Sequence, residues 1–241
     1  ATTQTIVVNS AGTYSVQVTQ GGCTGNDAIN VTVNPSPIVN LGPDATICAG
    51  SSITLDAGNV GATYLWSTGA TTQTIVVNSA GTYSVQVTQG GCTGNDAINV
   101  AVTPLPVVNL GPDATICAGS SITLDAGNVG ATYLWSTGAT TQTIVVNSAG
   151  TYSVQVTQGG CTGNDAINVA VTPLPVVNLG PDATICAGSS ITLDAGNVGA
   201  TYLWSTGATT QTIVVNSAGT YSVQVTQGGC TGNDAINVAV T

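Results

Sequence analysis

The chain has 241 residues and a net charge of −10 at pH 7, because all ten of its charged side chains are aspartates and it contains no lysine, arginine or histidine. Without a cation, binding to phosphate backbones is disfavoured, and side chains cannot form ion pairs with one another. A nucleophilic triad lacks its base, so the composition argues against an enzyme. No stretch approaches 18 consecutive apolar residues, so no transmembrane helix is encoded.

The phrase ATTQTIVVNSAGTYSVQV begins at Ala1, Ala70, Ala139 and Ala208, so the sequence repeats with a period of 69 residues. The first copy holds only the second half of the repeat, which is typical of a segment taken from a longer array. The expected domains are the C-terminal half of an Ig-like repeat at 1–34 and three Ig-like repeats at 35–103, 104–172 and 173–241.

Within repeat 35–103, Thr, Val, Ile and Tyr alternate with polar residues between clusters of Gly, Asn, Asp and Pro, which is typical of short strands. The expected strands are Ile38 to Leu41, its continuation Ala45 to Cys48 after the Gly42-Pro43 kink, Ser52 to Ala57, Ala62 to Ser67, Gln73 to Asn78, and the stretches TYSVQVTQ and DAINVAV. Apolar-in, polar-out alternation in six or seven such strands predicts an all-β fold. The expected architecture is a tandem array of small Ig-like antiparallel β-sandwiches that forms an elongated fibre.

Paired prolines mark the beginning of every complete repeat. Proline cannot donate to a sheet ladder, and closely spaced prolines favour an extended, semi-rigid segment. The predicted linker residues are Pro35, Pro37, Pro104, Pro106, Pro173 and Pro175.

The stretch SITLDAGNVGATYLWSTGATTQTIVVNSAGTYSVQVTQ resembles the immunoglobulin-like and PKD-type sandwich repeats of secreted Bacteroidota surface proteins. The resemblance covers the whole chain and implies export by the type IX route to the cell surface. Such modules occur in adhesins, enzymes and stalks alike, so the resemblance is specific for the repeat and not for an activity. The acidic WDFGDG stretch of PKD domains is replaced here by Trp66-Ser67-Thr68-Gly69-Ala70, so any role of those acids does not carry over.

One tryptophan and one tyrosine of each repeat are expected to be structural. A tryptophan on the third strand of an Ig-like sandwich normally lies in the core, although a sugar-stacking platform is the alternative. The tyrosine after Ala-Gly-Thr resembles a tyrosine corner. The predicted core residues are Trp66, Trp135, Trp204, Tyr83, Tyr152 and Tyr221.

The three aspartates of a repeat, Asp44, Asp56 and Asp96, occupy turn or strand-end positions, where short side chains hydrogen-bond the backbone. We therefore expect no catalytic, cofactor or metal site. A calcium site is the alternative, because the loops carrying Asp56, Asn59, Asn95 and Asp96 bring oxygen ligands to one pole of the sandwich.

Each complete repeat has two cysteines in fixed places without zinc-ligand spacing, which indicates disulfides from an oxidising compartment; reduced, buried thiols are the alternative. In Ig-like topology Cys117 lies at the pole facing the next repeat and Cys161 at the opposite pole, roughly 25 Å away, beyond the reach of a disulfide. The expected pairs therefore join neighbouring repeats: Cys48–Cys161 and Cys117–Cys230. The open alternative is pairing within repeats: Cys48–Cys92, Cys117–Cys161 and Cys186–Cys230. Under the first scheme, Cys23, Cys92 and Cys186 have partners outside these residues.

These features favour a structural extracellular fibre or stalk on the bacterial cell surface, because near-identical copies suit a spacer better than a recognition array. Its partners would be neighbouring repeats of the same chain and other copies of the fibre. The alternative is a multivalent adhesin that binds a glycan or surface ligand weakly through each repeat. Neither function involves nucleic acid or membrane insertion.

Overall fold

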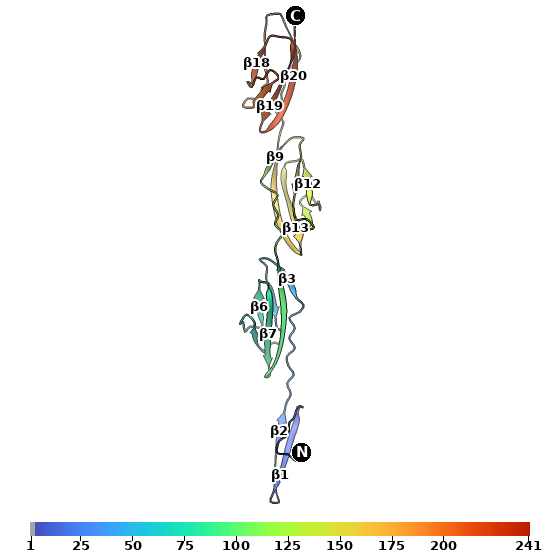
Figure 1. Cartoon of the computed structure of the whole chain (residues 1–241), viewed down its shortest axis with the longest axis vertical. Helices are drawn as coiled ribbons and strands as arrows, with labels where there is room; N and C mark the ends of the chain where they lie inside the picture. Colours follow the sequence, from blue (N-terminus) through green and yellow to red (C-terminus); the bar gives the residue numbers. More distant parts are fainter. Residues whose placement is uncertain (1–2) are drawn as a thin grey trace. The chain divides into compact units, whose positions relative to one another are not determined.

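In a computed structural model, residues 3–241 are described, and they contain strands and turns but no helix (Figure 1). No helix long and apolar enough to cross a membrane therefore occurs among them. The chain divides into two compact units between Pro104 and Leu105. Each complete sequence repeat within these units has its own pair of sheets and its own core.

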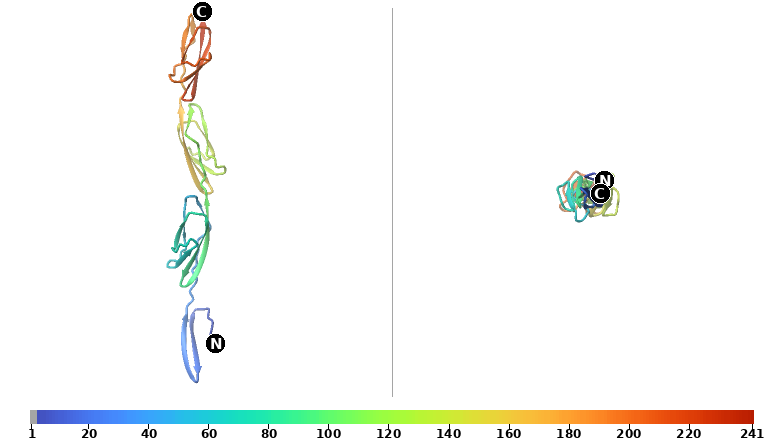
Figure 2. Two further views of the ribbon diagram at one scale, coloured as in Figure 1. Left: turned by 60° about the vertical axis from the view of Figure 1, so that its left-hand side comes forward. Right: turned by 90° about the horizontal axis from the view of Figure 1, so that it is seen from below.

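Repeat 104–172 shows the architecture shared by all three complete repeats. Its strands are β9 (Ala114–Cys117), β10 (Ile122–Asp125), β11 (Thr132–Trp135), β12 (Thr143–Val146), β13 (Gly150–Gln158) and β14 (Cys161–Thr172). One layer is a four-stranded sheet in the order β11-β13-β14-β9, and the other is the two-stranded sheet β10-β12. Figure 1 labels β9 and β13 of the first layer and β12 of the second, and Figure 2 shows the same ribbon from two other directions.

The other two complete repeats have the same topology. The strands of repeat 35–103 are β3 (Ala45–Cys48), β4 (Ile53–Asp56), β5 (Thr63–Trp66), β6 (Thr74–Val77), β7 (Gly81–Gln89) and β8 (Cys92–Thr103). Those of repeat 173–241 are β15 (Ala183–Ile185), β16 (Ile191–Asp194), β17 (Thr201–Trp204), β18 (Thr212–Val215), β19 (Gly219–Gln227) and β20 (Cys230–Val240). The partial repeat forms one hairpin, β1 (Gly12–Gln20) with β2 (Cys23–Val31).

The all-β, Ig-like sandwich predicted from the sequence is confirmed, but its sheets are not purely antiparallel. In every complete repeat the first strand pairs in parallel with the last, as β9 does with β14, where Cys117 is the register partner of Thr172. The reason lies in how the chain passes through a repeat. It enters at one pole and leaves at the other, so the first and last strands both run from the first pole to the second.

Each core is made by the alternating apolar residues of the long hairpin together with the shorter strands. In repeat 104–172, Trp135, Val154 and Val156 are at most 2% exposed. The buried set comprises Leu124, Ala126, Trp135, Ile144, Val146, Tyr152, Val154, Val156, Ile167 and Val169. Polar residues between them face outward, and no polar side chain among the described residues is buried without a hydrogen-bond partner. Stability therefore rests on apolar burial and on the sheet ladders.

The predicted strand Ile38 to Leu41 does not form; residues 38–41 are extended but belong to no ladder. The Leu41 amide donates a hydrogen bond to the Asp96 carboxylate at 2.7 Å instead of to a strand carbonyl. The Ile38 carbonyl accepts from the Asn59 side chain at 2.9 Å. Side chains thus take the place of a neighbouring strand along this segment.

Candidate functional site, the junction between repeats

Repeat 104–172 and repeat 173–241 are joined covalently. A disulfide links Cys117, the last residue of β9, to Cys230, the first residue of β20, with their Cα atoms 5.6 Å apart. Cys230 is 2% exposed, so the bond is buried on that side. The disulfide therefore ties the end of one sandwich to the tip of the long hairpin of the next.

Backbone and small side chains complete this junction. Thr172, the last residue of β14, accepts a hydrogen bond from the Ala118 amide at 2.9 Å, so the first and last strands of the repeat end together. The Thr172 carbonyl oxygen lies 3.9 Å from the Cys230 sulfur. A Cβ atom added to Gly228, at the tip of the β19–β20 hairpin, would lie 3.2 Å from the Thr172 methyl group. The hairpin tip of one repeat thus packs on the strand end of the previous repeat.

Pairing within a repeat is excluded for all three complete repeats. Cys117 and Cys230 are bonded to each other, which rules out Cys117–Cys161 and Cys186–Cys230. Cys92 is a free thiol, which rules out Cys48–Cys92. The physical reason is the one given by strand length: the two cysteines of a repeat lie at opposite ends of the sandwich. Cys23, Cys92 and Cys186 are free in the structure.

The segment that precedes β9 is held against its own repeat. The Pro106 carbonyl oxygen approaches Gly163 of β14 so closely that an added Cβ atom would lie 2.2 Å from it. The Leu110 amide donates to the Asp165 carboxylate at 2.7 Å, and the Asn128 side chain donates to the Val107 carbonyl at 2.8 Å. The equivalent glycines, Gly94 and Gly232, receive Pro37 and Pro175 in the same way. Nothing in the sequence marked these glycines, because only the fold shows what approaches them.

The aspartates serve as acceptors for neutral donors. Asp113 accepts from the backbone amide of Asn168 at 2.9 Å and from its side chain at 3.1 Å. Asp125 accepts from the Gly127 amide at 2.8 Å and from the Gln142 side chain at 2.9 Å. These donors stabilise the ionised carboxylates and so lower the pKa of both aspartates. For Asp113 the largest cause is the backbone amide of Asn168, and for Asp125 it is the side chain of Gln142.

The side chains of the calcium alternative hydrogen-bond groups of the chain itself. In repeat 35–103, the Asp56 carboxylate accepts from Gly58 and Gln73, the Asp96 carboxylate accepts from Leu41, and the Asn59 amide points its donors at backbone carbonyls. Asp96 lies within the long strand β8 and not at a loop, contrary to the expectation of a turn or strand end. Among residues 3–241, no group of three or more histidine, cysteine, aspartate or glutamate side chains gathers to hold a metal.

Acid is expected to destabilise the folded chain. The lowered pKa values belong to Asp44, Asp56, Asp113, Asp125, Asp182 and Asp194. Because their folded pKa lies below the unfolded value of about 3.9, their contribution is fully present above that value and is lost as the pH falls through the folded pKa. The melting temperature should be constant from pH 7 to about 5 and fall below about pH 4. Thermal scans monitored by circular dichroism measure this, with the variant Asp113→Asn/Asp182→Asn expected to show a smaller fall; an unchanged melting temperature at pH 3 would contradict it.

The tryptophan and tyrosine side chains combine burial with specific hydrogen bonds. Trp135 is 2% exposed and its indole nitrogen donates to the Thr141 carbonyl at 2.8 Å. The Tyr152 hydroxyl donates to the Ser148 carbonyl, four residues upstream, at 2.9 Å, which is the geometry of a tyrosine corner. Tyr133, which sequence reasoning did not single out, donates to the carbonyls of Gly127 and Asn128 at 2.9 and 2.7 Å. It holds the turn in which Asn128 has a positive φ of 53°.

Replacing Tyr152 with phenylalanine is expected to cost about 1 kcal/mol of unfolding free energy, because one net hydrogen bond is lost while the ring stays packed. Chemical denaturation of the purified chain measures the change. Ser148→Ala is the matched control: it removes the neighbouring hydroxyl but keeps the carbonyl acceptor, and its effect should be smaller. An equal loss in both variants would contradict a role for the backbone acceptor.

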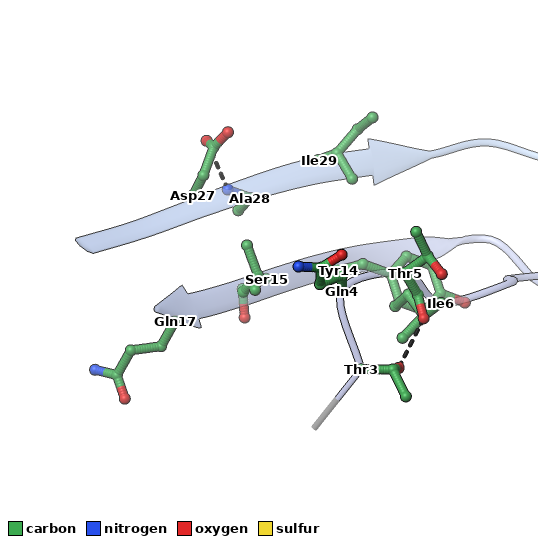
Figure 3. Close-up of a pocket in the computed structure, with 11 residues that line it drawn as sticks. Thr3, Gln4, Thr5, Ile6, Tyr14, Ser15, Gln17, Asp27, Ala28 and Ile29 are labelled. Carbon is green, nitrogen blue, oxygen red and sulfur yellow. Dashed lines mark hydrogen bonds between the residues drawn. The ribbon is translucent and has the colours of Figure 1, made fainter. Parts of the chain in front are cut away.

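A hollow lies on the β1–β2 hairpin, between residues 3–6 and the face carrying Tyr14, Val16 and Ile29 (Figure 3). Val16 is 57% exposed and Ile29 66%, whereas their equivalents Val85 and Ile98 are both 2% exposed. The hollow therefore lies on the face of the hairpin that corresponds to the core face of a complete repeat. It has the composition of a repeat core, not of a ligand site.

No protein-family model and no curated protein matches this chain. Among solved structures, the eight N-terminal Ig domains of Down Syndrome Cell Adhesion Molecule isoform 1.30.30 match with a TM-score of 0.50 and 14% identity. That match covers 98% of this chain and 40% of the other. The I67–I69 fragment of titin gives a TM-score of 0.45 and 13% identity, over 87% of this chain and 100% of the fragment. The first likeness supports the tandem Ig-like fold and says nothing of function.

Proposed function

We propose that the chain is part of an extracellular structural fibre or stalk, built from Ig-like repeats that are cross-linked to their neighbours. The observation that carries the proposal is the disulfide Cys117–Cys230, because it joins two repeats of identical sequence. A cross-link between consecutive modules restricts their relative motion, which is useful in a spacer and dispensable in independent binding modules. The role requires no catalysis.

The same link is proposed for the preceding junction, between Cys48 and Cys161. The residues around these cysteines repeat those around Cys117 and Cys230, so we expect the equivalent sulfur atoms to pair in the same way. Alkylation under denaturing, non-reducing conditions tests this. We expect three labelled thiols in the wild type and four in Cys48→Ser, whose Cys161 loses its partner. Three labelled thiols in the variant would contradict the pairing.

An extracellular location at the cell surface is proposed from the chemistry of the cysteines. Disulfides form and persist in oxidising compartments and are rare in the cytosol. The resemblance to secreted Bacteroidota surface repeats supports the same location, and export by the type IX route belongs to that proposal.

Immunogold electron microscopy of the native cells tests the fibre. Antibodies raised against repeat 104–172 should label thin filaments outside the cell, at many positions along each filament, because every repeat carries the epitope. Cells lacking the coding sequence are the control. Label confined to the cell interior, or to particles without filaments, would contradict the proposal.

An adhesin is the second candidate, and one surface feature favours it. Leu134 and Val145 are 54% and 68% exposed, and their equivalents in the other complete repeats are exposed to the same extent. A weak contact at these positions, multiplied along an array, would give avidity. A glycan array probed with the whole chain discriminates: saturable binding that is lost in Leu134→Ser/Leu203→Ser favours the adhesin, and no binding favours the stalk.

A further inference from the structure

The disulfide Cys117–Cys230 changes which residues connect the ends of repeats 104–172 and 173–241. The shortest covalent path from Pro104 to Thr241 follows residues 104–117, crosses the disulfide, and continues along residues 230–241. Residues 118–229, which hold most of both sandwich cores, lie outside this path. We infer that tension along the array bypasses the sandwich cores and is carried by the first and last segments of each repeat. This inference rests on the proposed role as a fibre.

The segments on this path are already extended and can lengthen little. In repeat 104–172 the path follows the stretch that ends with β9, and β9 pairs in parallel with β14 from Ala114↔Val169 to Cys117↔Thr172. A strand rises about 3.3 Å per residue, close to the maximum of about 3.6 Å for any chain. The Pro106 carbonyl seated on Gly163 and the Leu110 amide bonded to Asp165 hold the first segment against β14. The segment that carries the load in this repeat is therefore nearly fully extended and is held along β14.

With the proposed cross-link at every junction, the array has two continuous covalent paths. One path follows residues 161–186, from the start of β14 through the next linker to the residue after β15, and then crosses a disulfide to the hairpin of the following repeat. The second path has the same course, offset by one repeat. Residues 118–160, and their equivalents, connect the two paths and carry no axial load.

Without the cross-link, a repeat under tension has no such protection. Unfolding would release all 69 residues between the ends of the repeat, which adds about 20 nm of length at about 3.3–3.6 Å per residue. The reduced and oxidised chains are therefore expected to differ in how far they stretch.

Single-molecule force spectroscopy on the full chain, tethered by its two ends, tests the inference. The oxidised chain should show at most one unfolding step of about 20 nm. After tris(2-carboxyethyl)phosphine is added to chains already tethered and folded, three such steps are expected, one for each complete repeat.

Variants separate the cross-link from other effects of the reductant. Cys48→Ser/Cys117→Ser should show three steps without reductant, and its circular dichroism spectrum should match the wild type. Cys186→Ser removes a cysteine that is free in the structure and should keep the oxidised pattern. Three full steps in oxidised wild-type chains whose disulfide is verified by mass spectrometry would overturn the inference. A bypass found in chains that antibodies do not locate in filaments would leave the load path standing and contradict the fibre instead.

Discussion

Replacing Trp135 with alanine is expected to lower the unfolding free energy of repeat 104–172 by about 3–5 kcal/mol. The indole is 2% exposed, lies at the centre of the repeat core, and donates a hydrogen bond to the Thr141 carbonyl. Truncation would leave a cavity that the surrounding valines cannot fill, together with an unpaired carbonyl. A domain of this length has a total stability of roughly 3–10 kcal/mol, so the repeat should be largely unfolded at moderate temperature.

Calorimetry of the full chain measures this loss, because one repeat of three should melt separately at a lower temperature. Leu134→Ala is the matched control, since the neighbouring leucine points outward and is 54% exposed. Its effect should stay within about 0.5 kcal/mol. If both variants lost the same stability, the tryptophan could not be the centre of the core.

Gly163→Ala is expected to destabilise repeat 104–172 by about 3 kcal/mol, the upper end for an overpacked site. The added methyl group would lie 2.2 Å from the Pro106 carbonyl oxygen, far inside any van der Waals contact. Neither side can yield easily, because Gly163 is in the ladder with Val156 and the linker is bonded through Leu110 and Val107. The substitution should release the linker from β14.

Gly25→Ala is the control for this prediction. Gly25 is the equivalent glycine of the partial repeat, and an added Cβ there meets nothing within 4 Å. Denaturant titrations should show a loss of stability in Gly163→Ala and none in Gly25→Ala. Equal loss in both would mean that β-propensity, not the linker carbonyl, explains the glycine. Unchanged stability of Gly163→Ala would show that the linker is not held on the strand.

The strands and the fold class could be predicted from the sequence because burial in this sandwich is locally periodic. Tyr83, Val85 and Val87 alternate with Ser84 and Gln86, and period-two alternation fixes both the strand and its inner face. The positions of Cys117 and Cys161 at opposite poles followed from strand length in the same way. The expected pairing between repeats therefore depended only on the distance between the two poles of one sandwich.

The packing of the segment before β9 against Gly163 could not be predicted, because it depends on contacts between residues far apart in sequence. Residues 38–41 alternate like a strand, yet their amides and carbonyls are satisfied by Asp96 and Asn59. Gly163 reads as an ordinary weak position of a strand until Pro106 is placed beside it. Tyr133 was not singled out for the same reason: its hydroxyl holds a turn whose shape the residue types alone do not specify.

The disulfide between repeats also sets an order on the maturation of the chain. Cys117 and its partner Cys230 are 113 residues apart in sequence. Cys161 is nearer to Cys117 in sequence, so an unfolded chain in an oxidising compartment would favour the wrong pair. Correct oxidation therefore requires that repeat 104–172 fold first and hold its two cysteines apart. A repeat that folds slowly would be oxidised wrongly.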